Sequence, residues 1–360
     1  MIKKAGEKMK RIILSVLFAA ALLLTGCSMG IEVNDRAFVQ LMGIERENEI
    51  YYVSMQVYKS ESGTPEPDVS KANTITAKGE GATIHEAISA AELTLGKKAF
   101  LGHIKMLVVG NGIKNPADEL SLFLDGSVSP SCPVAYSENP AAVIETLLEE
   151  GSFSAEQILA LADSSAAQGK TVFTSVAELA ASTGELDTAA ALPIIAAEEK
   201  SVTFEGVTLA QKNGVRGKLD ETEIIGTKLL LNQFETGDKI TVPVKIDGDR
   251  ATVFITSACT KLDAEMSDVL TVNAEIKLKM TVAENPYDIK PALIEKAVRQ
   301  QISESCMSAY SATVHENLCD IFGVKKLVRR YCPERYNDYC NAESSYLAGS
   351  TLNLKVKSEM

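Results

Sequence analysis

Apolar and polar residues alternate along two short stretches near the start of the chain. The pattern runs over residues 37–44 and returns over residues 50–58, with polar residues 45–49 between them. Alternation with a period of two is typical of strands that bury one face, so the two stretches predict a β-hairpin. A further strand is expected over residues 73–78, and Gly79-Glu80-Gly81 is expected to turn the chain after it.

The spacing of apolar residues then changes to that of a helix. Thr83, with Glu86 three residues later, predicts a capping box at the start of a helix that ends near Leu95. Residues 104–109 are apolar on both faces after Lys105, which predicts a strand in the centre of a sheet. Helices and strands continue to alternate to about residue 181, a pattern typical of α/β or α+β domains.

The second half of the chain is richer in hairpins. Asn213-Gly214 is a strong turn signal between apolar stretches, and Asp247-Gly248-Asp249 separates another pair. The expected elements are strands over 201–212, 215–219, 239–246, 250–257, 268–282 and 352–356, a short helix after Asp220, and a helix from Pro291 to about Ile321.

Together these patterns predict an α/β (α+β) fold of three domains, with mixed β-sheets packed with helices. A chain of 360 residues suits two or three domains. We expect an N-terminal α/β domain over residues 27–198, a middle hairpin-rich domain over 199–266 and a C-terminal α+β domain over 267–360.

Residues 1–26 have a pattern of their own. Lys8, Lys10 and Arg11 precede an apolar run over residues 12–24, which is shorter than the about 20 residues that span a bilayer. The run is typical of an export signal, and Leu24-Thr25-Gly26-Cys27 closes it in the manner of bacterial lipoproteins. We therefore predict a lipoprotein signal peptide over residues 1–26 and lipidation, by acyl chains such as palmitate, at Cys27. The alternative is an ordinary secretory signal with an incidental cysteine.

The lipid anchor has a consequence for location. Each buried methylene of an acyl chain contributes about 0.8 kcal/mol, and more than one chain anchors a protein stably. No other stretch of the sequence is apolar enough to cross a bilayer. We expect a soluble body that is tethered to a membrane on its extracytoplasmic side.

The net charge of the chain limits the classes of partner that it can be expected to bind. The chain carries a net charge of −12, and residues 1–26 hold five Lys/Arg and one Glu, so residues 27–360 carry −16. So acidic a body argues against binding to nucleic acid and against broad adsorption to anionic lipid. Residues 325–335 are an exception, with five basic residues and one acidic residue. They form either a solvated helix face or a contact with lipid headgroups or an acidic partner. The residues proposed for that contact are Lys325, Lys326, Arg329 and Arg330.

Motifs for catalysis are missing from the sequence. His85, His103 and His315 are far apart and have no metal-ligand spacing, and no phosphate-binding loop or nucleophile elbow occurs. We expect no cofactor, no metal and no enzymatic activity. Once Cys27 is assigned to the lipid, six cysteines remain: Cys132, Cys259, Cys306, Cys319, Cys332 and Cys340. Their even number in an exported protein permits disulfides, whereas buried free thiols are the alternative and zinc is a third choice.

Several different short motifs follow one another along the chain. They begin with Glu32-Val33-Asn34-Asp35-Arg36-Ala37 and continue with Gly79-Glu80-Gly81-Ala82-Thr83-Ile84-His85-Glu86-Ala87. Next come His103-Ile104-Lys105 and, near the end, Asp320-Ile321-Phe322-Gly323 and Arg330-Tyr331-Cys332-Pro333. In this order behind a lipidation signal, the motifs resemble those of the spore germinant-receptor C-subunit lipoproteins, the Ger(x)C family.

The resemblance implies a lipid-anchored, three-domain subunit without enzymatic activity that acts in spore germination. It also implies a complex with two integral membrane subunits, of the A and B types, at the inner membrane of the spore, where nutrients are sensed. The alternative is a lipid-anchored solute-binding protein of a transporter, which would have two similar lobes. A third hypothesis, an exported enzyme or folding factor, would need a clustered catalytic set.

Overall fold

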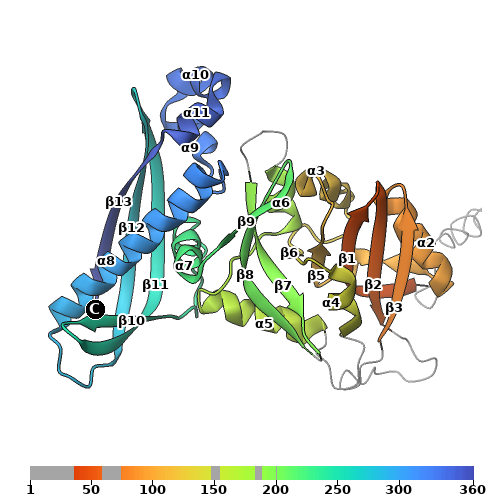
Figure 1. The fold of residues 1–360 in the computed structure, drawn as a ribbon, viewed down its shortest axis with the longest axis horizontal. Helices are drawn as coiled ribbons and strands as arrows, with labels where there is room; N and C mark the ends of the chain where they lie inside the picture. The colour runs from red at the N-terminus through yellow and green to blue at the C-terminus, as the bar shows by residue number, and fades with distance from the viewer. Residues whose placement is uncertain (1–35, 59–73, 147–154, 183–188, 200) are drawn as a thin grey trace, which may run out of the picture. The chain divides into compact units, whose positions relative to one another are not determined.

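The computed structural model describes residues 36–58, 74–146, 155–182, 189–199 and 201–360 (Figure 1). The predicted signal peptide and Cys27 lie outside this part of the chain. Residues 37–360 belong to one compact unit, and the fold below is that unit.

The first half of the described chain builds a nine-stranded mixed sheet in the order β3-β2-β1-β5-β6-β7-β8-β9, with β4 paired to β1. Strands β1, β5, β6 and β7 are parallel neighbours, and the strands outside them are antiparallel. The strands are β1 (Arg36–Glu47), β2 (Ile50–Tyr58), β3 (Thr74–Gly81), β4 (Lys98–Phe100), β5 (Met106–Val109), β6 (Val134–Tyr136), β7 (Ala189–Ala197), β8 (Val202–Gln211) and β9 (Gly214–Leu219).

Helices cover both faces of this sheet. Helices α2 (Ile84–Leu95), α3 (Pro116–Leu120) and α6 (Val176–Ala181) share one apolar core with the strands. Helices α4 (Pro140–Thr146) and α5 (Ala155–Ala167) share a second core on the other face. Layers of helices around a largely parallel centre are typical of α/β domains, as the sequence predicted.

The second half builds a four-stranded sheet, β10-β11-β12-β13, in which β13 runs parallel to β12. Helix α8 packs along one face of it (Figure 1), and that face holds the apolar core. The elements are α7 (Glu221–Leu230), β10 (Ile240–Ile246), β11 (Asp249–Met266), β12 (Leu270–Glu284), α8 (Pro291–Tyr310) with a π-helical end (Ser311–Glu316), α9 (Val324–Tyr331), α10 (Tyr336–Asn341), α11 (Glu343–Ala348) and β13 (Thr351–Glu359). Two mixed sheets with helices confirm the predicted fold class.

The predicted hairpins are present. Strands β1 and β2 pair as predicted, and the turn residues Asn48 and Glu49 both have positive φ, of 49° and 67°. Asp247 and Gly248, with φ of 53° and 101°, turn the chain between β10 and β11 in the same way. Two successive residues with positive φ match the right-handed twist of the flanking strands, which is why such turns are common in hairpins.

The turn predicted at Gly79-Glu80-Gly81 is wrong, because these residues belong to β3 and pair with residues 51–53 of β2. Their glycines serve close packing instead. A Cβ atom on Gly79 would lie 2.1 Å from the backbone oxygen of Ala87 in α2. Helix α2 therefore rests directly on the backbone of β3. The predicted cap is present, since Thr83 is the N-cap of α2 and its side chain accepts from the N–H of Glu86. The return bond of a capping box is displaced by one residue, because Glu86 accepts from the N–H of Ala82.

Strand β7 was not predicted, because alanines and Pro193 conceal it in the stretch 182–200. It pairs with the parallel strand β6 at Tyr136 and Ile194 and along its full length with β8. Strand β11 is also longer than the predicted 250–257. Segment 199–266 contributes β8 and β9 to the first sheet and β10 and β11 to the second. The division into three domains remains a prediction.

Candidate functional site

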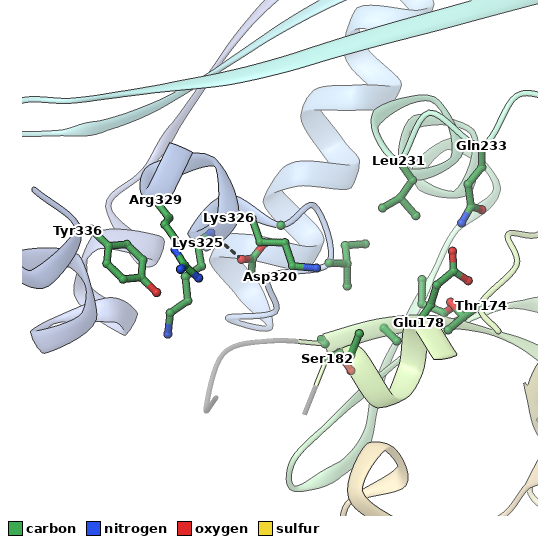
Figure 2. A pocket seen from close by; sticks show the side chains of 16 residues that line it. Thr174, Glu178, Ser182, Leu231, Gln233, Asp320, Lys325, Lys326, Arg329 and Tyr336 are labelled. Atoms are coloured by element: carbon green, nitrogen blue, oxygen red, sulfur yellow. Dashed lines mark hydrogen bonds between the residues drawn. The ribbon is translucent and has the colours of Figure 1, made fainter. Parts of the chain in front are cut away.

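A cavity of about 400 Å³ lies where α6 and β7 face α9 and α10 (Figure 2). Its polar and charged lining comes from distant parts of the chain, and its apolar wall is formed by small or aliphatic residues. The labelled side chains are Thr174, Glu178, Ser182, Leu231, Gln233, Asp320, Lys325, Lys326, Arg329 and Tyr336. We call this the α6–α9 cavity.

Asp320 organises the α9 side of the cavity. Its carboxylate oxygens accept from the backbone N–H groups of Val324, at 2.7 Å, and Lys325, at 3.0 Å. These N–H groups open α9 and have no partner within the helix, so Asp320 caps it. Burial raises the pKa of Asp320, while the N–H donors and the charge of Lys326 oppose that shift. The predicted motif Asp320-Ile321-Phe322-Gly323 is thus a helix start.

The four basic residues predicted for a partner or membrane contact have different surroundings. Lys325 is buried, and its Nζ lies 3.1 Å from Glu343 in α11, so it joins two helices. Lys326 and Arg329 are exposed and line the α6–α9 cavity. Arg330 is exposed, with its guanidinium carbon 5.2 Å from the ring centre of Tyr331. Lys325, Lys326 and Arg329 therefore all line the α6–α9 cavity, Lys325 being held there by Glu343, whereas Arg330 lies outside the lining.

The polar residues on the α6 side are held by their own neighbours. The Glu178 carboxylate accepts from the backbone N–H of Ser175 at 2.8 Å and completes a capping box on α6. The Gln233 amide donates to the carbonyl of Phe173 at 2.7 Å, and Thr174 donates to the carbonyl of Ala191 at 2.7 Å. This wall is preorganised, since its groups are fixed without a ligand.

A second cavity, of about 560 Å³, lies at the carboxyl ends of the parallel strands β6 and β7. Ligands of α/β sheets bind where successive strands send their helices to opposite faces. Here that point falls between β5, followed by α3, and β6, followed by α4. Hydrogen bonds within the protein already engage the side chains at this point, because Tyr136 donates to Asn111 at 2.7 Å and Asn111 donates to the carbonyl of Glu138 at 3.2 Å.

The cysteines and histidines have structural surroundings. The six cysteines after Cys27 are free thiols, with Cys259 and Cys340 exposed and the others buried. His315 lies 2.9 Å from the carbonyl of Ser350, and the ring of His103 packs against the rings of Phe38 and Phe100 in a cluster of three. Within the described ranges, no group of three or more His, Cys, Asp or Glu residues could hold a metal ion. None of the helices in the same ranges is long and apolar enough to span a membrane.

Comparison with known proteins identifies the family. Residues 30–197 match the model of the spore germination protein N-terminal domain, and residues 205–360 match that of the spore germination B3/GerAC-like C-terminal domain. No curated protein matches the chain.

The fold also has a solved counterpart. The chain is similar to the crystal structure of the GerBC protein, with a TM-score of 0.57 and 14% identity over 88% of this chain and 96% of that one. At this identity the similarity shows the fold, while the two family models cover most of the chain in the order that the motifs predicted. The chain therefore belongs to the Ger(x)C family of germinant-receptor C subunits, which act in spore germination.

Proposed function

We propose that this chain is a non-enzymatic C subunit of a nutrient germinant receptor, anchored by lipid at Cys27 to the inner membrane of the spore. One observation carries the proposal: the two family models follow each other along residues 30–360, directly behind the lipidation signal Leu24-Thr25-Gly26-Cys27. Membrane association and membership of a receptor complex go with the family.

The anchor supplies what the body of the chain lacks. With a charge of −16 on residues 27–360, electrostatics oppose adsorption to anionic lipid. Two or more acyl chains on Cys27 provide binding that does not depend on the protein surface. We infer that the anchor, rather than a basic patch, holds the chain at the membrane.

The proposed partners are two integral membrane subunits, of the A and B types. Among the basic residues that we expected at a partner contact, Arg330 is the one that is exposed and outside the α6–α9 cavity. Lys325 is occupied by Glu343, so we assign it to the stability of α9 and α11. The solute-binding alternative is not supported, because it requires two similar lobes and the two sheets differ in strand number and order.

The first test is an affinity pull-down of the tagged, lipidated protein from detergent-solubilised spore membranes, with bound proteins identified by mass spectrometry. Recovery of two polytopic membrane proteins is the expected result. Recovery of transporter components, or of no membrane protein, would overturn the receptor-subunit proposal. Charge reversal of Arg330 to Glu, with Lys245 to Glu as a second exposed charge reversal, then tests the contact.

A further inference from the structure

We propose that the α6–α9 cavity binds a small aliphatic monocarboxylate, whose carboxylate is held by Lys326 and Arg329. The proposal rests on the cavity and does not depend on the receptor-subunit function. It assigns a role to the basic run at residues 325–335.

Charge makes the cavity a site for an anion. Lys326 and Arg329 are three residues apart, so they lie on one side of α9, and both line the cavity (Figure 2). The ion pairs formed among the described residues include neither of them. Both side chains add positive charge to the lining of the cavity, and this charge favours an anion there.

The carboxylates of the cavity do not fill this role. Asp320 accepts from the backbone N–H groups that open α9, and Glu178 accepts from the N–H and hydroxyl groups of Ser175. The positive charge of Lys326 lowers the pKa of Asp320, against the effect of burial. The guanidinium carbon of Arg329 lies 6.0 Å from the ring centre of Tyr336. Arginine can hold a carboxylate with two parallel hydrogen bonds, so Arg329 is the principal contact.

The walls of the cavity define the rest of the ligand. A volume of about 400 Å³ is at the lower end of the range for small-molecule sites. Residues 189–191 of β7 are all alanine, and Leu231 and Ile321 add aliphatic surface. These walls fit a short hydrocarbon body. The charge of −16 on residues 27–360 disfavours a multiply charged anion such as phosphate.

The test uses the full chain in detergent and hexanoate as the probe, with hexanamide as its neutral counterpart. Ligand-observed NMR titrations measure the dissociation constants, and detergent without protein corrects for partitioning. We expect saturable hexanoate binding that is about tenfold tighter than that of hexanamide, since the carboxylate of hexanoate forms charged hydrogen bonds that the neutral amide cannot form. No saturable binding of hexanoate, or equal binding of the two probes, would overturn the proposal.

Variants locate the site. Arg329→Gln and Lys326→Gln should each weaken hexanoate binding about tenfold, because each removes a charged hydrogen bond. Arg330→Gln is the matched control, since it lies on the same helix outside the cavity lining, and it should leave binding unchanged. Unchanged binding in Arg329→Gln and Lys326→Gln, or displacement of hexanoate by inorganic phosphate at equal concentration, would show the assignment to be wrong. Circular dichroism checks that each variant is folded.

Discussion

At the scale of single residues, burial decides what the ionisable side chains do. Lys228 is 3% exposed, and its Nζ lies 2.9 Å from Asp238 and 2.7 Å from the carbonyl of Gln233. It connects the end of α7 to the loop before β10. Lys325, one of the four basic residues predicted for a partner contact, has a similar internal role. Charge patterning alone could not reveal this role, because the partner, Glu343, is 18 residues away.

Lys228→Ala should destabilise the protein strongly. The substitution leaves Asp238 largely buried without its partner, and breaking a buried pair costs about 3–5 kcal/mol. Urea denaturation followed by circular dichroism measures the loss. The double variant Lys228→Met with Asp238→Leu should recover most of it, because no uncompensated charge remains. A single variant as stable as the parent protein would contradict this account.

The buried thiols give a prediction for pH. Burial raises the pKa of Cys132 and of Cys306 from 9.0 to about 12. The folded chain therefore keeps thiol protons that the unfolded chain releases between pH 9.0 and about 12. The free energy of unfolding should fall as pH rises through that range, by about 1.4 kcal/mol per pH unit for each thiol. Cys306→Ala should reduce the slope.

Alkylation tests the same two thiols separately. Iodoacetamide at pH 8 should modify the exposed Cys259 and Cys340 in the folded protein and reach Cys132 and Cys306 only after denaturation. Peptide mapping by mass spectrometry identifies the modified residues. Equally fast modification of Cys306 in the folded state would show that it is not shielded.

At the scale of elements, the sequence predicted most hairpins and helices, because turn residues and caps act over a few neighbours. It failed where a long-range contact decides the conformation. Gly79 and Gly81 read as turn residues, yet they lie in β3 because α2 packs on them. Strand β7 escaped because its alanines have little β-propensity, and its pairing with β8 provides what local sequence does not.

Gly79→Ala tests the packing of α2 on β3. The added Cβ would meet backbone atoms of Ala87 and Ala91, at 2.1 and 2.4 Å, so the whole helix must shift. We expect a loss of about 3 kcal/mol in urea denaturation, as for severe overpacking. Gly349→Ala is the control, since its nearest contact is Ser345 at 3.3 Å, and it should change stability little. Equal effects of the two substitutions would refute the close-packing account.

At the scale of the whole molecule, the family was accessible from the sequence because its short motifs lie in one order along the chain, and both family models match in that order. The α6–α9 cavity was not accessible. It combines α6, β7 and α9, and α6 and α9 are separated by more than 100 residues of sequence. No local spacing therefore links Glu178 to Arg329. Sequence reasoning found Lys326 and Arg329 through charge, but could not separate them from Lys325 and Arg330.

Cys27→Ser tests the anchor on the intact protein. Without an acyl acceptor the chain should move from the membrane fraction to the soluble fraction on fractionation of cells that express it, while its circular dichroism spectrum stays unchanged. Cys259→Ser, at an exposed cysteine of the folded body, is the control and should remain with the membrane. Retention of the Cys27→Ser variant in the membrane would argue against lipid anchoring.

The parallel pairing of β13 with β12 also sets an order for biosynthesis. The nine-stranded sheet needs only residues 36–219, so it can form while the rest of the chain is still being made and exported. The four-stranded sheet takes its edge strand from residues 351–359, so it is complete only after synthesis has reached them. Premature termination near residue 350 would therefore leave an intact first sheet and a β12 that is paired with β11 on one edge and unpaired on the other, a species that quality-control proteases can recognise.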